Sequence, residues 1–148
     1  MAVNFAFSRQ PPHPASEVAE LHVPADLTSL GPVRSAIGGA LARRGWTGES
    51  AMSVLLAAHE AVANAVEHGS ADGAEVEVRF TVTGAQAAIW VIDGGRPGAA
   101  LPLGAPAPPP PASSRGRGLM IMRALADRLE TWPAGAGAAV LMEFRRSL

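Results

Sequence analysis

The sequence contains no cysteine, no tyrosine and no lysine, so all 12 of its basic residues are arginine. The lack of cysteine excludes disulfide frameworks, thiolate metal sites and cysteine nucleophiles. The lack of lysine excludes the P-loop lysine, the strand lysine of the ordinary protein-kinase fold and Schiff-base chemistry. If the protein binds a nucleotide, it must therefore do so by another design.

The sequence also has little net charge and no long apolar run. The formal net charge is −1 and only 17% of the residues are charged, which leaves no overall signature of binding to nucleic acid or a membrane surface. No apolar run approaches the roughly 18 residues of a membrane span. The first residues lack the pattern of a secretory signal and are broken by Pro11, Pro12 and Pro14. We therefore expect a cytoplasmic protein with no nucleic-acid or membrane partner.

The remaining composition is that of one globular domain. The chain has 148 residues, of which 48% are hydrophobic. We expect residues 1–16 to form a flexible N-terminal tail and residues 17–148 to form a single domain. Within this domain, residues 94 to about 115 read as a long Pro-rich loop, a kind that is uncommon unless it is functional or disordered.

Hydrophobic periodicity predicts an α+β fold. Apolar residues alternate in the segments expected to be strands and recur at helical spacing in the others. A sheet with helices on one face accounts for this order of elements, and the sheet should be antiparallel or mixed. The expected strands are 17–23, 75–83, 87–93, a stretch from about 131, and 138–145; the expected helices are 31–44, 48–69 and 117–129.

Three polar residues lie four apart on the long predicted helix. Glu60, Asn64 and His68 therefore share one stripe among apolar neighbours, a costly arrangement unless the stripe faces a site or solvent near the helix end. A carboxylate can accept a proton, and an amide oxygen suits Mg²⁺. A zinc hydrolase is disfavoured because Ala63 stands where the second histidine of H-E-x-x-H would be.

Asp93 ends a predicted buried strand and precedes two glycines. A carboxylate there can accept a hydrogen bond from an amino group, and a glycine such as Gly95 lets a flat ring approach the backbone. An adenine base requires that combination. An ordinary Asp-Gly turn explains the same residues, so this motif alone does not distinguish an adenine site from a turn.

The third motif, Gly116-Arg117-Gly118-Leu119, opens a predicted helix. Amide groups at a helix start point outward and, with the helix dipole, favour phosphate; Arg115 and Arg117 would add charge-assisted hydrogen bonds. The spacing is not G-x-G-x-x-G and no strand directly precedes it, so a Rossmann site is excluded.

Taken in order, the three motifs resemble those of the GHKL, or Bergerat, ATPase superfamily, and in particular its small anti-sigma-factor serine/threonine kinases. The resemblance covers about residues 18 to 146. It implies a two-layer α/β sandwich with a mixed, mostly antiparallel sheet. The stretches that carry it are Glu60-Ala-Val-Ala-Asn64-Ala-Val-Glu-His68-Gly69, Asp93-Gly-Gly95-Arg-Pro97 and Gly116-Arg-Gly118-Leu119.

The resemblance also implies roles for single residues. Glu60 would be the general base, Asn64 would hold Mg²⁺ against the phosphates of ATP, and Asp93 would bind the adenine amino group. The other residues expected to bind nucleotide are His68, Gly69, Gly95, Pro97, Arg115, Gly116, Arg117, Gly118 and Leu119. Residues 98–115 occupy the place of the ATP lid.

The resemblance further implies a Mg-ATP-dependent kinase that phosphorylates a Ser or Thr of an anti-sigma-factor antagonist. A sigma factor would be a second partner, and relatives of this kind are often homodimers. The sequence departs from relatives in its Pro- and Ala-rich lid and in the alanines of residues 135–140, where relatives often carry threonines. These departures leave open a second reading, a nucleotide-gated module that sequesters a sigma factor or another regulator without transferring phosphate.

Overall fold

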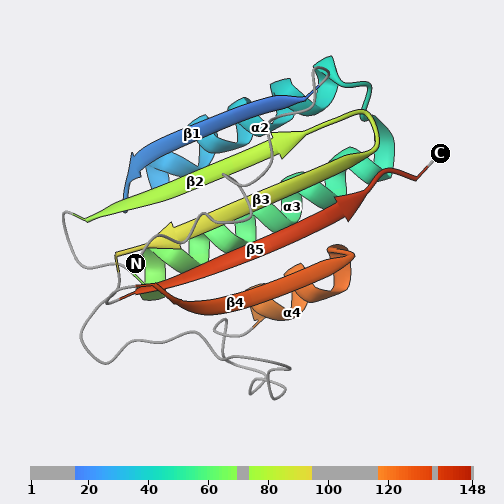
Figure 1. Cartoon of the computed structure of the whole chain (residues 1–148). Helices are drawn as coiled ribbons and strands as arrows, with labels where there is room; N and C mark the ends of the chain where they lie inside the picture. Colours follow the sequence, from blue (N-terminus) through green and yellow to red (C-terminus); the bar gives the residue numbers. More distant parts are fainter. Residues whose placement is uncertain (1–15, 70–73, 95–116, 135–136, 148) are drawn as a thin grey trace.

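The structure, a computed structural model of the whole chain, describes residues 16–69, 74–94, 117–134 and 137–147 (Figure 1). The predicted tail at 1–15, nearly all of the predicted Pro-rich loop and the site candidates Gly95, Pro97, Arg115 and Gly116 lie outside the described residues.

A five-stranded sheet forms one layer of the fold. The strand order is β1-β2-β3-β5-β4, and every pairing between these strands is antiparallel, one of the two arrangements that the sequence pattern allowed. Buried residues alternate along β2, as the sequence pattern predicted. The strands are β1 (Glu17–Pro24), β2 (Glu75–Val82), β3 (Gln86–Asp93), β4 (Arg128–Ala134) and β5 (Gly137–Arg145).

The helices form the second layer and lie on one face of the sheet (Figure 1). A 3-10 turn, η1 (Leu27–Ser29), leads into α2 (Leu30–Arg43), as the irregular start before Gly31 predicted. The long helix α3 (Gly48–Asn64) continues into a π-helical turn, η2 (Ala65–Gly69). The third helix is α4 (Arg117–Leu125). The expected two-layer α/β sandwich is therefore confirmed.

The hydrophobic core fills the space between the two layers. Its fully buried side chains come from all three helices and from the helix-facing positions of the strands, for example Ile37, Val54, Ile89, Met122 and Met142. Trp46, which we expected to be a packing anchor, is buried, and its indole Nε1 donates to the carbonyl of Thr83 at 2.7 Å. This hydrogen bond ties the end of the helical hairpin to the β2–β3 turn. None of the described helices is long and apolar enough to span a membrane.

Two sequence-based expectations need correction. The helix predicted over 117–129 ends at Leu125, because the following residues join the sheet: the Asp127 amide donates to the Glu143 carbonyl, and Leu129 pairs with Met142. Pairing with the next strand, β5, outweighs the local helical pattern. Thr47 stands at the N-cap of α3 as expected, but its side chain makes no capping hydrogen bond.

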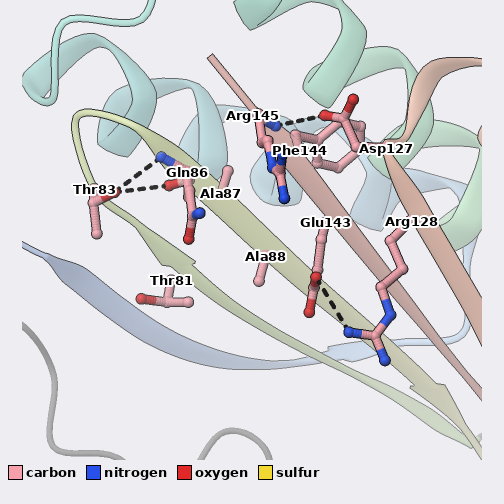
Figure 2. A pocket seen from close by; sticks show the side chains of 10 residues that line it. All are labelled: Thr81, Thr83, Gln86, Ala87, Ala88, Asp127, Arg128, Glu143, Phe144 and Arg145. Atoms are coloured by element: carbon pink, nitrogen blue, oxygen red, sulfur yellow. Dashed lines mark hydrogen bonds and ion pairs between the residues drawn. The ribbon is translucent and has the colours of Figure 1, made fainter.

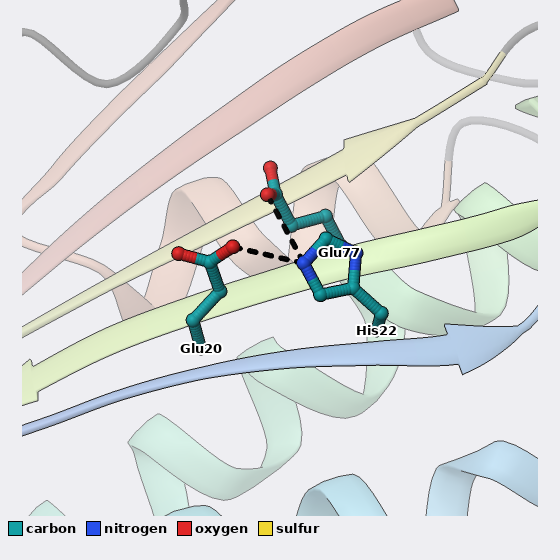
Figure 3. Close-up of side chains that lie close together, drawn as sticks. All are labelled: Glu20, His22 and Glu77. Carbon is teal, nitrogen blue, oxygen red and sulfur yellow. Dashed lines mark hydrogen bonds and ion pairs between the residues drawn. The ribbon is translucent and has the colours of Figure 1, made fainter.

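The outer face of the sheet carries a compact ionic cluster (Figure 3). His22 on β1 lies between two carboxylates: its Nε2 is 2.8 Å from Oε1 of Glu20 and 3.5 Å from Oε1 of Glu77. Arg79 on β2 contacts both glutamates as well. The hydrogen bond that Glu20 accepts from His22 raises the pKa of His22, and the same bond lowers the pKa of Glu20.

The His22 cluster should make stability depend on pH. Since the pKa of His22 is raised on folding, its contribution is present below the unfolded value near 6.5 and is lost as pH rises through the folded value. The lowered pKa of Glu20 makes its contribution present above about 4.5 and lost in more acidic solution. The His22→Ala variant should therefore lose the most stability between these limits, by about 1 kcal/mol or less because the side chains are exposed.

The measurement is thermal unfolding of wild type and His22→Ala between mildly acidic and alkaline pH. The Val18→Ala variant, altered on the same strand face without a titratable group, serves as the control. A loss for His22→Ala that stays constant through neutral and alkaline pH would contradict the ion-pair account.

Candidate functional site

Helix α3 places two of the expected site residues on one face at its C-terminal end. Glu60 and Asn64 lie one helical turn apart, and both are half-buried. Their neighbours Ala61 and Val62 are buried in the core on the other side of the helix. Two members of the predicted polar stripe thus share one face of α3, whereas His68 follows in the π-helical turn Ala65–Gly69 and its side chain lies outside the described part of the structure.

Gly118 on α4 faces this stripe at very close range. A Cβ atom added at Gly118 would lie 3.0 Å from Oε2 of Glu60 and 3.1 Å from both Nδ2 and Oδ1 of Asn64. Helices α3 and α4 pack against each other, and Gly118 itself is buried. Only a residue without a side chain leaves the carboxylate and the amide unobstructed at this point. The structure therefore brings the first and third motifs together.

The remaining residues of the third motif take different positions. Arg117, the first residue of α4, is exposed, whereas the side chain of Leu119 is buried in the hydrophobic core. Arg117 therefore lies on the surface at the helix start, and any contribution of Leu119 to binding has to come from its backbone.

Asp93 lies at the end of β3 and is 6% exposed, which is unusual for a carboxylate. One of its oxygens, Oδ1, accepts a hydrogen bond from the backbone amide of Ala138 at 3.3 Å. This contact fixes the carboxylate against the first residues of β5. Gly94 has room for a side chain, since an added Cβ would meet Ala74 only at an ordinary 3.8 Å.

The π-helical turn η2 links the two parts of the site. It contains His68 and Gly69, follows Asn64 directly and packs against β3, the strand that ends at Asp93. In Figure 1 the end of α3 and the arrowhead of β3 lie at the same end of the sheet. The described members of all three motifs thus belong to one end of the fold.

The amide of Ala138 is a site group that the motifs did not single out. Its role depends on the register of β5 against β3, in which Ile92 pairs with Ala139. In the sequence, residues 135–140 stood out only because they are rich in alanine. A backbone amide is present at nearly every residue, so no residue type indicates that the one at Ala138 is a donor. A residue pattern cannot show such a contact before the strand pairing is known.

A pocket of about 590 Å³ lies elsewhere, at the opposite end of β3 and β5 (Figure 2). It contains none of the predicted site residues. Polar groups of its lining contact each other: the backbone amide of Arg145 donates to Oδ2 of Asp127 at 2.6 Å, and Nη1 of Arg128 is 3.6 Å from Oε2 of Glu143. The lining residues are Thr81, Thr83, Gln86, Ala87, Ala88, Asp127, Arg128, Glu143, Phe144 and Arg145.

Within the described ranges, one group of histidine and acidic side chains is close enough to hold a metal ion. It is the Glu20–His22–Glu77 cluster on the outer face, already engaged by Arg79. It shares no residue with the motif site on α3 and β3.

Comparison with known proteins agrees with the fold. The model of a family described as the histidine kinase-like ATPase domain matches residues 23–144. Among solved structures, the chain is similar to the crystal structure of the RsbU and RsbW domains of Rv1364c from Mycobacterium tuberculosis, with 21% identity and a TM-score of 0.66. That similarity covers 88% of this chain but only 32% of the other chain. No curated protein matches the sequence.

The close approach at Gly118 can be tested by substitution. In Gly118→Ala the new methyl group must displace Glu60 or Asn64, so the side-chain amide resonances of Asn64 should shift in the NMR spectrum. Gly31→Ala is the matched control, because Gly31 is also near the start of a helix but has open space around it. The control should gain up to about 1 kcal/mol of stability from helix propensity.

Gly118→Ala should show less of that gain, since the contact strain offsets it. Equal stabilisation by both substitutions, with unchanged Asn64 resonances, would contradict the close approach.

Proposed function

Because the chain belongs to the family of histidine kinase-like ATPase domains, we propose that it is a Mg-ATP-dependent serine/threonine protein kinase. In this proposal it acts as an anti-sigma regulatory factor and transfers the γ-phosphate of ATP to a Ser or Thr of an anti-sigma-factor antagonist. The observation that carries the proposal is the contact of Gly118 with Glu60 and Asn64, which puts a carboxylate and an amide at the start of a helix.

Glu60 supplies the base in this proposal. As the acceptor hydroxyl oxygen bonds to the γ-phosphorus, its proton passes to the Glu60 carboxylate, the bond to the bridging oxygen breaks and ADP leaves. Phosphoryl transfer depends on positioning and on stabilising charge more than on covalent chemistry. Glu60 lies near the C-terminal end of helix α3, and its half-buried position leaves access for an acceptor.

Asn64 is the proposed ligand for Mg²⁺. An amide oxygen is a hard ligand, and Mg²⁺ commonly completes its coordination with water and substrate phosphates. The local structure fits this role, because the residue facing Asn64 is a glycine and no side chain of α4 fills the space beside its amide. When bound, the ion would neutralise charge on the phosphates.

The start of α4 is the proposed phosphate site. Its first backbone N–H groups have no partner within the helix, and the helix dipole adds positive potential there. Arg117 is exposed at this end and can donate to phosphate oxygens. Gly116 and Arg115, which precede the described part of α4, are proposed to extend the same site, and His68 and Gly69 are proposed to close it from η2.

Asp93 is the proposed adenine-binding residue. A buried carboxylate is a strong acceptor for an amino group, and the hydrogen bond from Ala138 orients it. Gly95 and Pro97 are proposed to line the same part of the pocket, and residues 98–115 to act as its lid. The proposed partners are an anti-sigma-factor antagonist and a sigma factor, and the proposed assembly is a homodimer. The proposed location is the cytoplasm, and residues 17–148 are proposed to form one domain.

The similarity to a structure that contains an RsbW domain favours this class of function over other members of the family. At 21% identity that similarity establishes the fold alone. The partners and the phosphate-transfer step are therefore part of the proposal. A nucleotide-gated module without transferase activity is the alternative, and it is distinguished by the second test below.

The first test is calorimetric titration of the full chain with ATP, with and without Mg²⁺. Wild type should bind saturably and depend on Mg²⁺. Asp93→Ala should weaken binding about tenfold or more, since a charge-assisted hydrogen bond contributes about 1.5–3 kcal/mol. Asp127→Ala is a matched control, because Asp127 also accepts an amide of β5, that of Arg145, but at the far end of the strand.

Asp127→Ala should leave ATP binding unchanged. An equal loss of affinity in both variants, at unchanged melting temperature, would contradict the assignment of Asp93.

The second test measures phosphate transfer from γ-labelled ATP to a candidate antagonist protein. Glu60→Gln preserves size and should keep ATP affinity while slowing transfer about a hundredfold or more, the range of a lost general base. Glu49→Gln, at the exposed first turn of the same helix, is the control and should transfer normally.

Normal transfer by Glu60→Gln would reject Glu60 as the base. Tight binding of the antagonist by wild type with no phosphate gained would favour the binding-module alternative.

A further inference from the structure

Two neighbouring strands on the outer face of the sheet bring an imidazole and two carboxylates to one point. His22 and Glu20 are two residues apart on β1, so their side chains lie on the same face of the strand. Glu77 on β2 is the direct cross-strand partner of His22. One possible ligand atom from each side chain lies within 4.8 Å of the other two, and Figure 3 shows both carboxylates directed toward Nε2 of His22.

The distances between these atoms are close to those in the coordination shell of a zinc ion. Zinc bonds of about 2.0–2.1 Å in a tetrahedral arrangement put neighbouring ligand atoms roughly 3.4 Å apart. Nε2 of His22 is 3.5 Å from Oε1 of Glu77 and 2.8 Å from Oε1 of Glu20. The first distance already fits, and the Glu20 carboxylate has to move outward by only roughly half an ångström.

Backbone pairing holds the three side chains in register. β1 pairs with β2 along its whole length, from Glu17 to Pro24. All three ligands therefore stand on paired strands and none comes from a loop. Ligands on regular elements are positioned more precisely than ligands on loops, so less ordering is needed when an ion binds.

The charge around the cluster favours a divalent cation. Glu20 and Glu77 contribute two negative charges, and Glu75 adds a third that acts on His22 from the same strand as Glu77. Arg79 supplies one positive charge, with Nη2 2.9 Å from Oε1 of Glu77 and Nε 3.5 Å from Oε2 of Glu20. With a neutral imidazole the group therefore remains negative.

Arg79 also leaves part of the cluster accessible to an ion. On Glu20 the guanidinium contacts Oε2, whereas the oxygen that faces the imidazole is Oε1. A contact of this kind orients a ligating carboxylate from behind. The side chains of His22 and Glu20 are 51% and 46% exposed, so an ion can enter from solvent and keep bound water.

We propose that His22, Glu20 and Glu77 form a binding site for Zn²⁺, with water completing a four-coordinate shell. The mixed donor set decides the metal, because Zn²⁺ accepts imidazole nitrogen together with carboxylate oxygen, whereas Mg²⁺ and Ca²⁺ prefer oxygen alone. In the metal-free chain the same groups form the ion pairs described above. The site shares no residue with the proposed ATP site and does not depend on the proposed function.

The test is calorimetric titration of the chelator-treated full chain with Zn²⁺, in mildly alkaline buffer because zinc binds the neutral imidazole. Wild type should bind one equivalent saturably, and a large excess of Mg²⁺ should not displace it. His22→Gln keeps a polar side chain without the imidazole and should weaken binding at least about tenfold. In wild type, Zn²⁺ should shift the Nε2 resonance of His22 in the NMR spectrum and leave the ring of His59 unchanged.

Two control variants separate this site from other zinc ligands of the chain. Glu143→Gln removes a carboxylate that also lies on the outer face of the sheet near an arginine, Arg128, and it should leave zinc binding unchanged. His59→Gln removes a histidine of helix α3 and should have the same result.

Three results would overturn the proposal. The first is wild-type zinc affinity in a folded His22→Gln chain, judged by an unchanged circular dichroism spectrum. The second is a loss of affinity in Glu143→Gln as large as that in His22→Gln, since general surface charge would then account for the binding. The third is displacement of Zn²⁺ by Mg²⁺, or no saturable binding of Zn²⁺ by wild type.

Discussion

The close approach of α4 to α3 at Gly118 is the constraint on which the candidate site depends. Any side chain at this position would push into the carboxylate of Glu60 and the amide of Asn64. A glycine in a helix costs up to about 1 kcal/mol relative to alanine, so its presence here needs a local reason. The reason in the structure is the close packing of α4 against α3, and in the proposed function the same glycine leaves the two polar groups uncovered.

The sheet fixes the second half of the site independently of the helices. Asp93 accepts a hydrogen bond from an amide of β5, so the register of β5 against β3 contributes to its position. The π-helical turn follows α3 directly and packs against β3, so it connects the end of α3 to the strand that carries Asp93. In the proposed function, these groups would contact the two ends of an ATP molecule, the adenine and the phosphates.

Much of this arrangement could be predicted from the sequence, because its signals are local. The four-residue spacing of Glu60 and Asn64 predicted one helix face, and alternation predicted β2 and β3 nearly to the residue. The predicted end of α4 was wrong because the residues after Leu125 form β4, which depends on pairing with β5 about ten residues later in the chain. The Ala138 amide was beyond sequence reasoning for the same reason, since its contact with Asp93 follows from the register of β5 against β3.

The most direct measurement of the central claim is an NMR titration of the isotope-labelled chain with Mg²⁺ and a non-hydrolysable ATP analogue. The account predicts saturable shifts of the Gly118 and Ala138 amides and of the Asn64 side-chain amide. It predicts no shift at Thr81 or Arg145, which line the pocket at the opposite end of the sheet. Shifts confined to that pocket, or none at all in a folded chain, would contradict it.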